Sequence, residues 1–414
     1  MTKILKLRFL AVLFMTVLFM LFATCVPPEG TGKSTIALST FQNAEIVIGQ
    51  QDFAGCEKNQ GGGNTADGST LSWVYGNPLL SATGTLYLPD YGNNRVLVFN
   101  SLPVVNGASA DFVLGQPDFT TVSSGTTASK MQGAQTIMIY DDRLYITDCN
   151  NSRVLIWNTI PSVSGAPADV VVGQTDMISN STSCTASTLR YSESIFIVDG
   201  KLLVSDSLNH RVLIWETLPD ANGAPASRVL GQADFIHSAR NDDNQDGIAD
   251  ATPSDRTMNY PAGIWSDGTR LYVVDSGNNR VLLWKTFPTA DFQPADAVLG
   301  QIDMTSNTEA AGQAGMDSPF FIDSNGIQLA VSDSDNNRVL VWNTLPAGNS
   351  SLPDTVLGQS DFIHNISNDD NQDGTNDAVA SARVLNFPTG LLFTADSLIV
   401  GDCNNCRYIV FKGN

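Results

Sequence analysis

Two short acidic segments carry the most specific chemical pattern in this sequence. DDNQDGIAD, from Asp242 to Asp250, and DDNQDGTND, from Asp369 to Asp377, both read D-x-N-x-D-G-x-x-D. Oxygen side chains at alternate positions, a glycine for the sharp turn and a carboxylate at position nine match the first three quarters of a calcium-binding loop. The acidic residue usual at position twelve is absent, because Pro253 and Ala380 stand there. The pattern predicts two weak calcium sites, and solvated acidic loops are the alternative.

The expected calcium ligands are the first, third, fifth, seventh and ninth residues of each segment, the seventh binding through its carbonyl oxygen. They are Asp242, Asn244, Asp246, Ile248 and Asp250 in the first segment, and Asp369, Asn371, Asp373, Thr375 and Asp377 in the second.

Three other kinds of site are not expected. The segment GTGKST resembles a phosphate-binding loop, but Pro27 stands where the first glycine of that loop is needed, and no strand or helix pattern flanks it. Of the three histidines, His237 and His364 are matching residues of a duplicated insertion and His210 lies within a repeated turn, so a three-histidine zinc site is not expected. No pattern typical of a catalytic serine or cysteine occurs.

These residues lie on a repeated element. LYVVDSGNNRVLLW, from Leu271 to Trp284, has close copies that begin at Leu86, Leu144, Leu202, Leu329 and Leu398. Each copy has two alternating apolar runs around a polar turn with Asp, Asn and Arg, which is typical of an antiparallel hairpin. The Asp and Arg of each turn are expected to pair for structural reasons, since all six copies have them. Matching aromatic residues at the end of each copy are expected to be buried between repeats: Phe99, Trp157, Trp215, Trp284, Trp342 and Phe411.

A second repeated phrase indicates how the array closes. The motif V-[LIV]-G-Q recurs six times, and five copies follow a hairpin. The remaining copy, AEIVIGQ from Ala44, precedes every hairpin, while the chain ends directly after the last hairpin. A chain that begins with the fourth strand of a unit and ends with the third can complete that unit only if its ends meet. The sequence therefore predicts an all-β fold, a six-bladed β-propeller with four antiparallel strands per blade, in which the N-terminal strand completes the last blade.

The hairpin pattern resembles the NHL repeat, whose name reflects an Asn-His-Leu stretch that Asn209 and His210 partly reproduce. The resemblance covers residues 44 to 414 and implies a propeller. It leaves the function open, because that family includes protein-binding and RNA-binding propellers and a zinc-containing amidating lyase.

Disulfides are expected from the pseudo-symmetry of the repeats and from export. The hairpin turns and the links between blades fall on one face of the ring, which holds both insertions and all five cysteines after Cys25. Cys149 and Cys184 belong to the turn and the outgoing link of the second blade, and Cys403 and Cys56 to those of the sixth. The expected pairs are Cys149 with Cys184 and Cys56 with Cys403, which leaves Cys406 free. Pairing of Cys56 with Cys406, or of Cys403 with Cys406, is the alternative.

The N-terminus has the pattern of an export signal. Lys3, Lys6 and Arg8 precede a 15-residue apolar run, which is too short for a membrane span and is followed by Phe-Ala-Thr-Cys, similar to a bacterial lipobox. We expect residues 1–24 to be a signal peptide, Cys25 to carry lipid, residues 25–43 to be a linker and residues 44–414 to form the propeller. Cleavage elsewhere, with loss of Cys25, is the alternative.

Charge and export together restrict the function. With 22 Lys and Arg against 42 Asp and Glu, the net charge is -20, so nucleic acid is not expected as a partner. We expect an exported, lipid-anchored binding propeller in the cell envelope, facing the periplasm or the exterior, with a protein, peptide or glycan ligand and membrane contact through the lipid alone. An enzyme of the lyase or lactone hydrolase type, with a metal at the channel mouth, and a structural envelope component are the alternatives.

Overall fold

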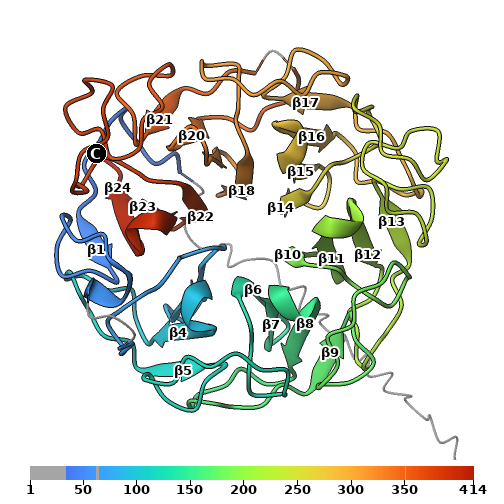
Figure 1. Ribbon diagram of the computed structural model, residues 1–414, viewed down its shortest axis with the longest axis horizontal. Coiled ribbons are helices and arrows are strands. Elements are labelled where there is room, and N and C mark those ends of the chain that lie inside the picture. Colours follow the sequence, from blue (N-terminus) through green and yellow to red (C-terminus); the bar gives the residue numbers. More distant parts are fainter. Residues whose placement is uncertain (1–33, 62–64, 350) are drawn as a thin grey trace, which may run out of the picture.

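The computed structural model describes residues 34–61, 65–349 and 351–414. In these residues six four-stranded antiparallel sheets form a closed ring, so the chain is a six-bladed β-propeller (Figure 1). Within the same residues no helix is long and apolar enough to cross a bilayer. The predicted signal peptide, Cys25 and the rest of the predicted linker up to residue 33 lie outside the described residues.

Each blade runs from an inner strand at the channel to an outer strand at the rim. Blades 1 to 3 comprise β2 (Leu79–Leu80), β3 (Leu86–Asp90), β4 (Arg95–Phe99) and β5 (Phe112–Leu114); β6 (Ala134–Tyr140), β7 (Arg143–Asp148), β8 (Arg153–Trp157) and β9 (Val170–Val172); and β10 (Ser192–Val198), β11 (Lys201–Asp206), β12 (Arg211–Trp215) and β13 (Arg228–Leu230). Blades 4 to 6 comprise β14 (Pro261–Ser266), β15 (Leu271–Asp275), β16 (Arg280–Trp284) and β17 (Ala297–Leu299); β18 (Pro319–Ser324), β19 (Leu329–Asp333), β20 (Arg338–Trp342) and β21 (Thr355–Leu357); and β22 (Pro388–Phe393), β23 (Ser397–Asp402), β24 (Arg407–Lys412) and β1 (Ile46–Ile48). Short 3-10 turns complete the description: η1 (Lys58–Gly61), η2 (Tyr91–Asn93), η3 (Cys149–Asn151), η4 (Ser207–Asn209), η5 (Ser276–Asn278) and η6 (Cys403–Asn405).

The ring closes as the sequence predicts. Strand β1 pairs antiparallel with β24, placing Ile46 opposite Val410 and Ile48 opposite Tyr408. In Figure 1 the N-terminal strand lies beside the last hairpin, so both ends of the described chain belong to blade 6. Strand β1 thereby covers the edge of β24, which would be exposed in an incomplete blade.

The hydrophobic core is divided among the interfaces between blades. Six clusters of buried side chains each join two neighbouring blades, and the two clusters that flank blade 6 include Val47 and Ile48 of β1. The six aromatic residues expected there are all buried. Four of them are tryptophans whose indole N–H donates to a backbone carbonyl nine residues later, which fixes the loop that leads to the outer strand onto the third strand.

The end of the predicted linker is attached to the propeller. Ile36 is buried, its N–H donates to Gln328 Oε1 (2.6 Å) and its carbonyl accepts from Gln328 Nε2 (3.0 Å). Asn414 N–H donates to the carbonyl of Ala37. Residues from Ile36 onward therefore belong to the folded body rather than to a free tether.

Candidate functional site

Each hairpin turn contains a buried ion pair. The arginine Nε donates to the aspartate Oδ2 at 2.7 or 2.8 Å, and the aspartate Oδ1 accepts a backbone N–H from the segment that leads into the inner strand of the same blade. The pairs are Asp90–Arg95, Asp148–Arg153, Asp206–Arg211, Asp275–Arg280, Asp333–Arg338 and Asp402–Arg407. Burial raises the pKa of each carboxyl, against the lowering effect of its arginine and its hydrogen bonds. The expected pairing is confirmed, and its presence in all six blades makes it part of the scaffold.

The residue that follows each of these N–H donors, which directly precedes the inner strand in blades 2 to 6, differs between blades in a way that could serve function. It has a positive φ in every blade: Trp73 (47°), Gly133 (74°), Tyr191 (66°), Tyr260 (58°), Ser318 (48°) and Phe387 (57°). Bulky side chains rarely adopt this conformation, and such strain gathers at functional sites. Gly133 is needed at its position because a Cβ there would lie 2.6 Å from Asn150 and from the ring of Tyr91. Four of the six positions nevertheless carry an aromatic residue at the channel mouth.

Six aromatic side chains form a continuous belt around the channel, which we call the aromatic belt: Tyr75, Tyr91, Tyr191, Tyr260, Phe320 and Phe387. Ring centroids lie 5.6 Å apart between Tyr75 and Tyr91, 5.1 Å between Tyr75 and Phe320, and 6.2 Å between Phe320 and Tyr260. Tyr260 contacts Tyr191 at 6.2 Å, and the hydroxyls of Tyr191 and Tyr91 lie 3.1 Å apart. The belt thus returns to its start, with the ring of Phe387 stacked 6.3 Å from Tyr75.

Tyr75 reaches the channel because the first part of blade 1 departs from the repeat. The inner strand β2 has two residues, and the preceding segment crosses toward blades 5 and 6. Asn77 Nδ2 donates to the carbonyl of Ile322 (3.1 Å), and its Oδ1 accepts the N–H of Leu391 (2.9 Å). Two glycines allow this passage: a Cβ at Gly76, whose φ is +128°, would lie 2.3 Å from the Gln135 carbonyl oxygen, and a Cβ at Gly390 would lie 1.9 Å from the Gly76 carbonyl oxygen. Blade 1 therefore places one ring near the channel axis.

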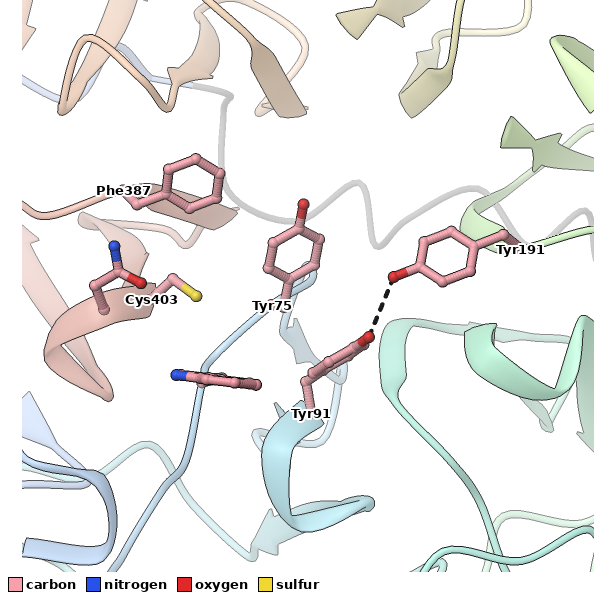
Figure 2. A pocket seen from close by; sticks show the side chains of 7 residues that line it. Tyr75, Tyr91, Tyr191, Phe387 and Cys403 are labelled. Atoms are coloured by element: carbon pink, nitrogen blue, oxygen red, sulfur yellow. Dashed lines mark hydrogen bonds between the residues drawn. The ribbon is translucent and has the colours of Figure 1, made fainter. Parts of the chain in front are cut away.

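A pocket of about 230 Å³ opens at the channel mouth, and we call it the channel pocket. Its lining consists of Trp73, Tyr75, Tyr91, Tyr191, Phe387, Cys403 and Asn404. Figure 2 shows the rings of Tyr75, Tyr91, Tyr191 and Phe387 around one shared space, with Cys403 at its edge. Trp73 is 58% exposed and forms part of the rim. Aromatic faces with a few polar groups are typical of small-ligand pockets.

Beneath the tyrosines the wall formed by blades 2 and 3 is polar. Glu193 is fully buried, and its Oε1 accepts a hydrogen bond from the Tyr260 hydroxyl at 2.5 Å. Among the described residues, Glu193 Oε2, both amide atoms of Gln135 and the Ser194 hydroxyl have no hydrogen-bond partner. Burial raises the pKa of Glu193 to about 7, against the lowering effect of the hydrogen bond from the Tyr260 hydroxyl. Single unpaired atoms also occur on repeated glutamines of the scaffold, but here three neighbouring residues of one wall carry them, which makes this wall a candidate functional site.

The two predicted calcium segments are folded alike. In the first, both carboxylate oxygens of the buried Asp242 accept backbone N–H groups, from Asp246 (3.0 Å) and Gly247 (2.8 Å). In the second, Asp369 accepts equivalent bonds from Asp373 and Gly374. The side chains of Asn244, Asp246, Asn371 and Asp373 are exposed. In the described part of the chain no three His, Cys, Asp or Glu side chains gather as a ready-made metal site, and calcium binding stays a prediction.

Both insertions are anchored by a buried asparagine pair. Asn241 exchanges two side-chain hydrogen bonds with Asn278 of blade 4 (3.0 and 2.9 Å), and Asn368 does the same with Asn405 of blade 6. The turns of blades 2, 3 and 5 use a backbone carbonyl in place of the second asparagine. The first residue of each calcium-like segment is thus fixed to the ring.

The five described cysteines are unbonded in this structure, so the expected pairs Cys149–Cys184 and Cys56–Cys403 are not formed in it. Cys149 is buried beside Tyr191, whereas Cys184 Sγ contacts the carbonyls of Phe235 and His237. Cys406 and Cys56 line one shallow pocket beside Trp73. The pairings stay predictions, and non-reducing peptide mapping decides among them.

The histidines lie in three separate places. His210 Nδ1 accepts the N–H of Tyr260 (3.0 Å), and burial lowers its pKa to about 4. His237 and His364 each contact an aspartate of their own loop, Asp234 and Asp361, at 2.8 Å. His210 therefore supports the channel wall, and the other two order the loops that lead into the insertions.

No protein-family model and no curated protein sequence matches the chain. Among solved structures, the computationally designed Ika8 protein is 9% identical (82% of this chain, 70% of that chain, TM-score 0.39). Virginiamycin B lyase from Staphylococcus aureus is 14% identical (84% of this chain, 95% of that chain, TM-score 0.38), and its catalytically inactive variant with quinupristin is 12% identical (84% and 96%, TM-score 0.41). At these values the likeness carries no argument about function.

Proposed function

We propose that this protein is an exported, lipid-anchored binding propeller that holds a small molecule, or one side chain of a larger ligand, in the channel pocket. The observation that carries the proposal is the aromatic belt. Its six rings come from five blades, 1, 3, 4, 5 and 6, and occupy three positions of the repeat, at each of which other blades carry non-aromatic residues. A scaffold role would call for the same residue in all six blades, as for the Asp–Arg pairs, whereas a binding site can be built from residues that vary between blades.

The face that bears the pocket also bears the hairpin turns and both insertions. The asparagine pairs tie each insertion to a hairpin turn, so the insertions stand around the channel mouth. A ligand larger than the pocket would therefore contact them, which suits a protein, peptide or glycan that presents one group to the channel. The alternative of an enzyme would use the same pocket, with Glu193 as its acid or base.

Fragment binding tests the proposed site. Trp73 is exposed at the pocket rim, while Trp157, Trp215, Trp265, Trp284 and Trp342 are buried, so a fragment in the channel pocket should change the emission of Trp73. In saturation-transfer NMR we expect small cyclic and aliphatic fragments to bind and to compete with one another for one site. Their signals should be lost in Trp73→Ala. Val104→Ala, at an exposed valine in a loop of the opposite face, is the matched control. Fragments that bind Trp73→Ala as well as the parent would overturn the proposal.

A further inference from the structure

Glu193 departs from the repeat at the position that faces the channel. The equivalent residue lies three positions after the N–H that each turn aspartate accepts, and it is Tyr75, Gln135, Glu193, Ala262, Phe320 and Thr389 in blades 1 to 6. Blade 3 thus buries a carboxyl where the other five blades carry neutral residues. Burying an ionisable group is costly unless it is paired.

No cation in the described residues pairs with Glu193. The structure gives it no ion pair, in contrast to the six turn aspartates, each of which contacts an arginine at 0% exposure. Its Oε2 has no partner, and the neighbouring Gln135 leaves both amide atoms unused. The groups whose pKa Glu193 raises are all acids: Tyr75 and Tyr91 of blade 1, Cys149 of blade 2, Tyr191 of blade 3 and Tyr260 of blade 4.

The lining of the channel pocket is likewise suited to a positively charged ligand. None of its described residues is basic, and five of the seven present aromatic rings. Ring faces attract cations through their negative quadrupole, most strongly where water is excluded. The net charge of -20 adds a favourable long-range field.

We infer that the channel pocket takes an organic cation, an alkylammonium or quaternary ammonium group, held by the faces of Tyr75, Tyr91 and Tyr191 with Glu193 behind them as the counter-charge. This inference rests on the proposed function, which needs only that the pocket binds a ligand. A pocket of about 230 Å³ is below the roughly 300–1,000 Å³ of sites for drug-sized molecules, so it suits a head group or one side chain.

A pair of isosteric probes separates charge from shape. Choline and 3,3-dimethyl-1-butanol have nearly the same size, and the first alone carries a charge. By calorimetry on the whole exported protein we expect choline to bind roughly tenfold more tightly than the neutral alcohol, as a desolvated cation–π site implies. Since a cation favours the ionised carboxyl, choline should bind more tightly at pH 8 than at pH 6, while the alcohol should show no such dependence.

Two variants test the role of Glu193. Glu193→Gln should keep the pocket, bind the alcohol as the parent does, and lose both the preference for choline and its pH dependence. Glu309→Gln, at an exposed acid, is the control for the loss of one negative charge and should retain them. Equal affinity for the two probes in the parent would overturn the inference and leave the proposed function standing. Failure of the fragments to bind at Trp73 would overturn the proposed function itself.

Discussion

The Sγ atom of Cys406 accepts a hydrogen bond from the backbone N–H of Trp73 at 3.4 Å. This contact joins the last hairpin turn to the first inner segment, and an equivalent contact joins every other pair of neighbouring blades. The acceptor is always the left-handed residue that ends the hairpin turn, and the donor is the positive-φ residue before the next inner strand. The five others are Asn94 to Gly133, Ser152 to Tyr191, His210 to Tyr260, Asn279 to Ser318 and Asn337 to Phe387.

Cys406→Asn is expected to stabilise the protein. A thiol is a weak acceptor, whereas Asn accepts well and tolerates the φ of 50° found at this residue. The adjoining shallow pocket beside Cys406 leaves space for the larger side chain. The free energy of unfolding should rise by about 1 kcal/mol in denaturant titrations. The converse change, Asn337→Cys, should lower it, and a decrease in Cys406→Asn would contradict the equivalence of these contacts.

Because β1 closes the ring, we expect a single charge introduced into this strand to destabilise the whole propeller. Val47 is fully buried opposite Ile409, so Val47→Asp buries an unpaired carboxylate and exposes the edge of β24. We expect a loss of at least 4 kcal/mol, measured by chemical unfolding. Val104→Asp makes the same substitution at a residue that is 78% exposed and should change stability little. Deletion of residues 44–50 should unfold the array, and a deletion mutant that melts like the parent would refute closure.

The fold could be predicted because its determinants are local and repeated. Each hairpin contains its own alternating pattern, turn residues and Asp–Arg pair, and the displaced copy at Ala44 requires a ring. The boundary of the linker could not be predicted, because the contacts of Ile36 with Gln328 join residues 292 positions apart.

The channel pocket was not predicted, because its residues deviate from the repeat and meet through closure alone. Tyr75 reaches Phe320 through the path of blade 1, which depends on Gly76 and Asn77. A signal was nevertheless present, since Tyr191, Tyr260 and Phe387 each stand directly before an inner strand. In the sequence alone Glu193 cannot be told from a surface acid, because only the folded structure places its strand, β10, beside the channel.

Glu193→Gln is expected to stabilise the ligand-free protein above pH 7. Below about pH 4.5 the carboxyl is protonated in both folded and unfolded chains, so its ionisation has no effect. Between 4.5 and about 7 the unfolded chain releases the proton and the folded chain keeps it, so the free energy of unfolding falls as pH rises. The loss is roughly 3 kcal/mol in total. Unfolding curves from pH 4 to 8 should show this slope in the parent and in Glu309→Gln, and a smaller one in Glu193→Gln; equal slopes would refute it.

The proposed lipidation of Cys25 predicts how the protein partitions. The parent should enter a detergent phase and incorporate a labelled fatty acid, because the lipobox-like segment ends at this cysteine. Cys25→Ser should abolish both properties. Cys184→Ser, at a cysteine of the folded propeller, should retain them. A mature N-terminus with a free amine at another residue would show that the anchor is wrong.

The insertions are expected to bind calcium weakly. Asp242 and Asp369 already orient each segment by accepting backbone N–H bonds, and the exposed oxygens of Asn244, Asp246, Asn371 and Asp373 follow at alternate positions. Because no acid stands at position twelve, each site has fewer ligands than a sensor loop, and a dissociation constant of roughly 10⁻⁴ to 10⁻³ M is expected.

Calorimetry with paired substitutions tests the calcium sites. Asp246→Ala with Asp373→Ala removes the fifth-position ligand from both segments and should abolish the calcium heats. The matched control is Asp118→Ala with Asp303→Ala, at two exposed aspartates in links that have no insertion. It also removes two charges, so a general loss of acidity would affect both double variants alike. Heats that survive in the first variant, or that are absent from the parent at millimolar calcium, would show that the segments are solvated loops whose order comes from Asp242 and Asp369 alone.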